Sequence, residues 1–264
     1  MKKILALAMT VVMSGLLLAG CGSAGSTASA PANTAPQKIV VGLDDNFPPM
    51  GFRDEKNNLV GFDIDLATEA AKRLGMQVEF KPIDWNSKEV ELNSKKIDVL
   101  WNGLTITEER KKNIAFTKAY MENRQIIVVL PNSDIKTKAN LAGKTVGVQD
   151  GSSSVDALNN DAATLKTFKE LKKYSDNVNA LLDLKAGRVD AVVVDEIVGR
   201  YYTNKKPGEY TILSDNFGSE EYGVGLRKDD TQLLEKIQKA LDDMKKDGKA
   251  AEISQKWFGE NIVK

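Results

Sequence analysis

The sequence predicts an α/β protein that folds into two lobes. Two stretches, 38–101 and 145–194, each alternate between short β-branched runs and segments whose apolar residues have helical spacing. This alternation is typical of a mostly parallel sheet covered by helices. Two further apolar runs, 124–130 and 221–226, stand outside these stretches. We expect them to be the strands that cross between the lobes.

The first stretch begins with a strand and a loop. The β-branched run Lys38–Leu43 predicts the strand. The paired prolines of Asp44–Pro49 exclude both helix and sheet ladder, so a loop follows. Residues 61–75 predict a helix with one apolar face, and Gly75 is its stop signal. The remaining elements are a strand at 77–80, a helix at 88–94 and a strand at 97–101.

The second stretch repeats this order, and a helical tail follows it. Its strands are predicted at 145–148 and 188–194, with a helix at 177–186 between them. The tail, 231–258, has helical spacing of apolar residues and must cover an apolar surface. We expect it to pack back on the first lobe, which would make that lobe discontinuous. The predicted boundaries are lobe one at 38–123 plus 221–264 and lobe two at 124–220.

Residues 1–20 have the layout of a secretory signal peptide. Lys2 and Lys3 precede an apolar run, 4–18, and small residues lead up to Cys21. The apolar run is shorter than the roughly 20 residues that a membrane-spanning helix needs. We therefore predict a cleaved signal peptide at 1–20 and not a permanent membrane span.

The segment Leu18–Cys21 (LAGC) resembles the lipobox of bacterial lipoproteins, in which the cysteine carries the lipid and the chain is cut before it. Cys21 is the only cysteine of the sequence, so its acylation also accounts for the odd thiol. Two or more acyl chains, such as palmitate, anchor a protein stably. Residues 21–37 carry no charge and no large apolar side chain, which predicts a flexible tether behind the lipidated cysteine.

The composition argues against several kinds of function. The chain has 37 basic and 37 acidic residues without a basic patch, so a nucleic-acid partner is not predicted. It has no histidine, which removes the commonest general base and metal ligand. Neither a metal site nor a cofactor is predicted.

Three polar positions follow predicted strands or begin helices, and each has two interpretations. Asp195 ends an apolar strand, where α/β sheets present ligand-binding groups, but it could equally cap the next helix. Gly151–Ser154 could bind an anion at a helix N-terminus or be a plain cap. Arg110 offers a planar fork for a carboxylate, but its spacing from the N-cap candidate Thr107 also fits a surface helix.

Four stretches of the sequence carry a resemblance to a known family: Val41–Pro49, Gly61–Ala67, Lys96–Lys112 and Gly187–Asp195. Together they resemble the polar amino-acid binding proteins of ABC importers, the family of the glutamine, histidine and lysine/arginine/ornithine receptors. The resemblance implies a two-lobe, periplasmic-binding-protein-like fold of type II, with two hinge strands and the ligand in the inter-lobe cleft. It also implies an extracytoplasmic, monomeric receptor that delivers a polar L-amino acid to a permease and its ATPase, without catalysis.

The resemblance also implies roles for the α-groups of the ligand. Arg110 would grip the α-carboxylate, and Asp195 of the other lobe would bind the α-ammonium. Further contacts to these two groups would come from Gly103, Thr105, Ser152 and Ser153. Each ligand charge needs such a partner in a closing, partly dry cleft.

The side-chain pocket is less well determined by the sequence. Phe47 and Trp85 match aromatic residues that sandwich the ligand's aliphatic stem, and Asp44 matches an acid that accepts from an amide or a cation. Taken alone, the aromatic residues could be core and Asp44 a loop cap. Asn102 and Gln149 match lesser pocket positions.

These positions favour glutamine or a basic amino acid, with cystine as the alternative. Relatives can carry Lys at the position of Gln149 and His at that of Val194, so strict glutamine specificity does not transfer. A remoter alternative is a cyclic amino-acid dehydratase on the same fold, with Asp44 or Glu196 as acid or base.

Overall fold

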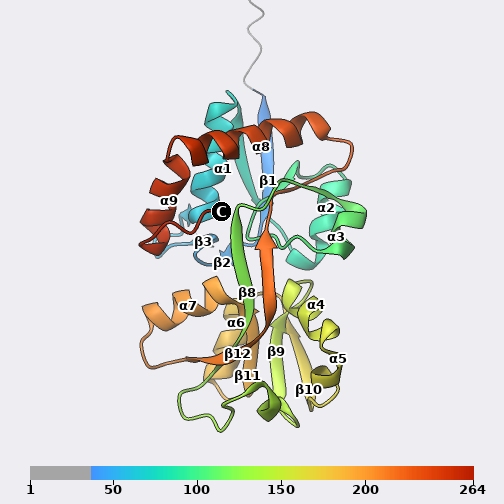
Figure 1. Ribbon diagram of the computed structural model, residues 1–264, viewed down its shortest axis with the longest axis vertical. Helices are drawn as coiled ribbons and strands as arrows, with labels where there is room; N and C mark the ends of the chain where they lie inside the picture. The colour runs from blue at the N-terminus through green and yellow to red at the C-terminus, as the bar shows by residue number, and fades with distance from the viewer. Residues whose placement is uncertain (1–36) are drawn as a thin grey trace, which may run out of the picture. The chain divides into compact units, whose positions relative to one another are not determined.

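The computed structural model describes residues 37–264. The predicted signal peptide, Cys21 and the tether up to residue 36 lie outside the described residues. The described part of the chain contains two five-stranded sheets and a small three-stranded sheet (Figure 1). None of the helices in this part is long and apolar enough to cross a membrane.

The first sheet has the strand order β5-β1-β6-β13-β7. β1 runs parallel to β5 and β6, whereas β13 pairs antiparallel with both of its neighbours. The strand bounds are β1 Lys38–Leu43, β5 Gln77–Pro82, β6 Val99–Leu100, β7 Ala115–Phe116 and β13 Gly225–Leu226.

Three helices, α1, α8 and α9, pack against one another beside this sheet (Figure 1). The Trp257 Nε1–H donates to Asp65 Oδ2 at 2.7 Å, and Arg73 pairs with Asp247 at 2.7 Å, so the C-terminal tail is tied to α1. The helix bounds around this sheet are α1 Phe62–Arg73, the 3-10 turn η1 Trp85–Ser87, α2 Lys88–Asn93, α3 Glu108–Asn113, α8 Thr231–Lys246 and α9 Lys249–Phe258. We call the first sheet with these helices lobe one.

The second sheet has the order β10-β9-β11-β8-β12 and, with α4 to α7, forms lobe two. β9 runs parallel to β10 and β11, and β8 is antiparallel to β11 and β12. The strand bounds are β8 Met121–Val129, β9 Thr145–Gln149, β10 Glu170–Tyr174, β11 Ala191–Asp195 and β12 Thr211–Tyr222. The helix bounds are η2 Lys138–Leu141, α4 Ser153–Asn160, α5 Ala162–Leu165, α6 Asn177–Lys185 and α7 Glu196–Lys205.

Two paired strands, β8 and β12, run side by side between the lobes (Figure 1). Their pairing extends from Thr211 opposite Val129 to Tyr222 opposite Met121. β7 precedes β8 and β13 follows β12, so both chain connections between the two sheets pass through this pair. We call β8 and β12 the hinge strands. The residue boundaries of the lobes stay a prediction.

The structure corrects several predicted elements. Asn46–Phe47 is a short strand, β2, paired with β3 (Gly51–Arg53), which in turn pairs with β4 (Leu59–Val60). The prolines exclude a ladder only at their own positions, so the expectation of a plain loop at 44–49 was wrong. The second hinge strand begins ten residues earlier than the predicted 221, because its polar sequence and two register shifts hide the strand period. Gly248, with φ 86°, divides the predicted tail helix in two.

Candidate functional site

The candidate residues come from both lobes and are all buried. On each lobe they follow the carboxyl ends of parallel strands, where open α/β sheets form ligand crevices. Asp44 and Phe47 follow β1, and Asn102 to Thr105 follow β6. The segment from Gln149 to Ser153 follows β9, and Asp195 ends β11.

Arg110 is a buried cation without a carboxylate partner. Thr107 caps α3, as predicted, by accepting from the Arg110 backbone N at 3.1 Å. The Arg110 side chain, however, is only 4 % exposed, so the interpretation of Arg110 as a surface residue was wrong. The guanidinium donates through Nη1 to Thr105 O at 2.9 Å and through Nη2 to Gly151 O of lobe two at 3.2 Å. No carboxylate among residues 37–264 forms an ion pair with it. Burial lowers the pKa of Arg110, which means that an anion here would be strongly favoured.

Asp195 is a buried acid of lobe two. Its Oδ1 accepts from Asn123 Nδ2 at 2.7 Å, from Gln125 Nε2 at 3.0 Å and from the Tyr222 hydroxyl at 2.5 Å. Burial, followed by repulsion from Glu220, raises the pKa of Asp195 to about 8. The side chain makes no capping bond to α7, so the helix-cap interpretation was wrong. The carboxyl faces the hinge strands instead.

Hydroxyl groups of the two lobes meet between Arg110 and Asp195. Thr105 Oγ1 of lobe one and Ser153 Oγ of lobe two lie 2.9 Å apart. Ser152 is at the N-cap position of α4 but donates its hydroxyl to Gln149 O at 2.7 Å and makes no capping bond. The structure thus brings Thr105 and Ser153 together, whereas the Ser152 hydroxyl is bonded to the backbone of its own turn.

Gly151 lets the two lobes approach closely. Its φ is 68°, and a Cβ added there would lie 2.9 Å from Asn86 Cα of lobe one. Its carbonyl oxygen accepts from Arg110 and, at 2.8 Å, from Lys88 Nζ. Backbone of lobe two therefore lies directly against lobe one at this turn.

Asp44 and Gln149 form a second contact between the lobes. Gln149 Nε2 donates to Asp44 Oδ2 at 2.6 Å, and Asn177 Nδ2 donates to Gln149 Oε1 at 2.8 Å. Asp44 Oδ1 accepts from Asn46 N at 2.8 Å, so the loop-cap interpretation also holds, for the other oxygen. Burial raises the pKa of Asp44 to about 6. Asn102 holds this loop by accepting from the Asp44 backbone N at 3.0 Å.

The backbone N–H of Gly103 is bonded to a buried acid, Asp63, which the sequence did not indicate. Its N–H donates to Asp63 Oδ2 at 2.7 Å, so this donor is already used. Asp63 is fully buried, accepts also from the Tyr120 hydroxyl at 2.9 Å, and has its pKa raised by burial to about 7. A Cβ on Gly103 would lie 2.8 Å from the Phe47 ring. Only the carbonyl group of Gly103 is left for a ligand.

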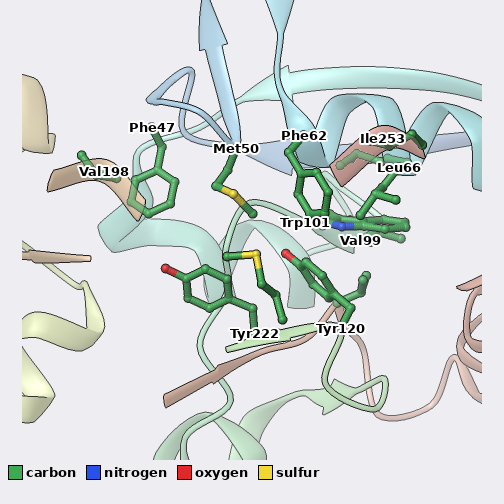
Figure 2. Packing of buried hydrophobic residues seen from close by; sticks show 14 of the residues in the cluster. Phe47, Met50, Phe62, Leu66, Val99, Trp101, Tyr120, Val198, Tyr222 and Ile253 are labelled. Atoms are coloured by element: carbon green, nitrogen blue, oxygen red, sulfur yellow. The ribbon is translucent and has the colours of Figure 1, made fainter. Parts of the chain in front are cut away.

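The two predicted aromatic residues lie in different hydrophobic clusters. Phe47 belongs to the cluster that contains Met50, Tyr120 and Tyr222, as Figure 2 shows. Trp85 belongs to a smaller cluster and carries the Lys88 ammonium 5.3 Å from its ring centroid. A sandwich of both rings around a ligand stays a prediction.

A cavity of ≈ 630 Å³ opens beside Thr105 and Ser153. Its volume lies within the range of small-molecule sites. Its lining includes the acids Glu108, Glu109, Asp156 and Glu220 and no lysine or arginine. Two larger hollows, of ≈ 960 and ≈ 980 Å³, contain none of the predicted ligand-binding residues, although the second is lined by Glu196, so size alone does not identify the site. Among residues 37–264 there is also no group of acids suited to hold a metal ion.

Sequence reasoning missed five polar residues that contact the candidate groups. Four of them lie on the hinge strands as two pairs, each spaced two residues apart, which places the members of a pair on one face of the strand. Two polar residues on the same face of a strand were the signal in the sequence that could have indicated these contacts. The fifth is a buried lysine, for which no signal existed. These residues are Asn123, Gln125, Glu220, Tyr222 and Lys88.

Comparison with known proteins agrees with this architecture. Residues 39–260 match the profile of the bacterial extracellular solute-binding proteins, family 3. The chain belongs to this family. The predicted resemblance and the predicted two-lobe α/β fold are thereby confirmed.

The relatives of this family 3 protein include receptors for several amino acids. The L-cystine-binding protein TcyJ of Escherichia coli is 34 % identical over 228 residues, which cover 86 % of this chain and 84 % of the relative. A solved ABC uptake transporter substrate binding protein from Streptococcus pneumoniae, with bound histidine, has 40 % identity and a TM-score of 0.83, covering 86 % and 94 % of the two chains. An ancestral arginine-binding protein bound to glutamine has 47 % identity and a TM-score of 0.79, covering 86 % and 100 %.

Proposed function

We propose that this protein is the substrate-binding receptor of an ABC importer for a polar L-amino acid, with basic amino acids favoured over glutamine. The observation that carries the proposal is a buried cation and a buried acid on the two sides of the cleft. Arg110 has no carboxylate partner among the described residues, and the acid Asp195 faces it from lobe two. An α-amino acid brings a carboxylate and an ammonium that complement these two groups.

The preference for a basic side chain rests on two observations. Asp44 is a buried acid whose bonds come from a backbone N–H and an amide, so it lacks a cation among the described residues. All charged residues that line the cavity beside Thr105 and Ser153 are acids, although Glu108 and Glu109 are paired at the surface with Lys111 and Lys112. A cleft of this sign attracts cations. Glutamine would use Asp44 as an acceptor, and a cystine ligand would need the same clamp on its α-groups.

Closure of the lobes would bring binding groups of both lobes onto the ligand. We expect ligand to meet Arg110 and Thr105 of lobe one first, and Ser153 and Asp195 to reach it when the hinge strands bend. A ligand shifts the population toward the closed state only by its preference for that state. The closed receptor, acting as a monomer, would then deliver the amino acid to a permease and its ATPase.

The relatives and the predicted signal peptide support the proposed location. Family 3 relatives include periplasmic and extracellular receptors, which supports an extracytoplasmic location for this chain. We extend the proposal to a lipid anchor at Cys21, on the lipobox resemblance alone. Palmitate labelling of the expressed chain tests it: Cys21→Ala should lose the label, and a label retained by that variant would contradict the anchor.

A thermal-shift panel of the common amino acids, ornithine and cystine tests the receptor function. Ligand at about 100 times its Kd stabilises the folded protein by roughly 2.7 kcal/mol. In a domain of this size that is a rise in Tm of roughly 5–10 °C. A receptor also returns its ligand unchanged, which NMR of the recovered solution would show. A panel without any shift would refute the proposal, and a consumed ligand would favour the dehydratase alternative.

A further inference from the structure

Glu220 is an acid on the hinge that reaches both lobes. It lies two residues before Tyr222 on β12, and the backbone of Thr105 forms a bridge with Tyr222. Glu220 Oε1 accepts from Thr105 Oγ1 of lobe one at 2.9 Å and from Ser153 Oγ of lobe two at 3.2 Å. These are the two hydroxyl groups that meet in the candidate cleft, so Glu220 sits at its centre.

Glu220 and Asp195 also share their hydrogen-bond donors. Asn123 Nδ2 lies 2.6 Å from Glu220 Oε1 and 2.7 Å from Asp195 Oδ1. Gln125 Nε2 lies 2.8 Å from the first oxygen and 3.0 Å from the second. Because two nitrogens each contact both oxygens, the two carboxyl groups are immediate neighbours. Two carboxylates at such a distance do not both ionise unless a cation joins them.

The surroundings of the pair offer acceptors for which the protein supplies no donor. All three donors to Asp195 end on Oδ1, and no described residue donates to its Oδ2. Asn123 is 4 % exposed, and its Oδ1 has no hydrogen-bond partner within the described chain. This oxygen belongs to the same amide group whose Nδ2 contacts both acids. An ammonium, with three N–H groups and no acceptor, is the chemical complement of such a place.

We propose that Glu220 and Asp195 together hold the α-ammonium of the ligand, and that the pair keeps one proton in the ligand-free protein and releases it to solvent when the ammonium binds. The ammonium replaces the shared proton one for one, so the net charge of the pair's site is the same in both states. This inference rests on the proposed function and adds to it a second ammonium-binding acid and a coupling of binding to pH.

The other charged and titratable groups around the pair do not supply that missing cation. Arg110 faces it from α3 but bonds to the carbonyl oxygens of Thr105 and Gly151. Tyr222 of β12 donates to Asp195, and Asp156 of α4 adds negative charge to the same region. Glu196 of α7 is paired with Arg124 and Arg200 at the surface.

Isothermal titration of the full-length protein with L-arginine, in phosphate and in imidazole buffer at pH 7.5, tests the proposal. At this pH Asp44, with a pKa of about 6, is mostly ionised, whereas the raised pKa of Asp195 keeps the proton on the pair. The buffer dependence of the heat should correspond to release of roughly 0.5–1 proton per ligand. Glu220→Gln should reduce this release, because repulsion from Glu220 adds to burial in raising the pKa of Asp195. It should also weaken binding at pH 9 by about tenfold, the effect of one charged hydrogen bond. Glu221→Gln is the matched control, because Glu221 is exposed and pairs with Lys264.

The outcomes separate this proposal from the receptor function. Binding of L-arginine without proton release, or equal release in Glu220→Gln, would overturn the shared pair and leave the receptor function intact. If no amino acid of the panel gave heat, the receptor function itself would be refuted and this inference with it. If Glu220→Gln did not fold, the wild-type protein alone would decide: Kd should weaken at least about tenfold from pH 8.5 to 6.5. A Kd that is constant over that range would overturn the proposal.

Discussion

Replacement of Arg110 tests the clamp directly. In Arg110→Ala the ligand carboxylate enters the cleft without its cation. The carbonyl oxygens of Thr105 and Gly151 lose the Arg110 donors at 2.9 and 3.2 Å, although Gly151 O keeps Lys88 Nζ. Removing one partner of a buried ion pair costs about 3–5 kcal/mol, because the other charge stays buried and unpaired. That corresponds to a Kd weakened by roughly a hundredfold to several thousandfold. Arg110→Lys should lose less, since it keeps the charge but not the fork.

The loss should be the same for every amino acid, because all share the α-carboxylate. Titration calorimetry with L-arginine and L-glutamine measures it, with Arg124→Ala as the control. Arg124 is an exposed arginine paired with Glu196, so its loss should leave Kd unchanged. The ligand-free Tm of each variant checks the fold. The reasoning fails if Arg110→Ala binds as tightly as the parent, or if it loses affinity for one ligand only.

Three further predictions concern the acids of the cleft and the contact between the lobes. Asp44→Asn removes the charge of the side-chain pocket but keeps an acceptor, so the Kd ratio of L-arginine to L-glutamine should rise about tenfold; an unchanged ratio would exclude Asp44 from recognition. Asp63 has its pKa raised by burial to about 7, so its stabilising protonated form is lost as pH rises from about 4 to 7. Asp63 should therefore contribute a fall of up to about 1.4 kcal/mol per pH unit to the stability measured by urea unfolding of the ligand-free protein, in addition to the falls from Asp44 and Asp195. Asp63→Asn should reduce the measured slope by that share; an equal slope in both proteins would contradict the assignment. Gly151→Ala places a Cβ 2.9 Å from Asn86 Cα at φ 68°, so it should weaken ligand binding about tenfold while most of the Tm is kept, whereas unchanged affinity would show that the lobes need not approach this closely.

Much of the fold could be predicted because its signals are local. The β-branched run of β1, the apolar face of α1 and the Thr107 cap of α3 each follow from a few neighbouring residues. The strand β12 could not be predicted in full, since its polar residues are held by pairing with β8, which is far away in the sequence. The short strand β2 was missed for the same reason: its partner, and not its own residues, makes it a strand.

The candidate site divides in the same way. The sequence by itself determined which residue types stand after the strands: Asp44 after β1, Arg110 in α3, and Asp195 at the end of β11. It left open whether Arg110 is on the surface and whether Asp195 caps a helix. Only the tertiary structure decided both, because burial and hydrogen-bond partners depend on how the lobes meet. Glu220 shows this most clearly. Its spacing from Tyr222 was visible in the sequence, but only the structure shows that it is the neighbour of Asp195, because Asn123 and Gln125, on the other hinge strand, contact both acids.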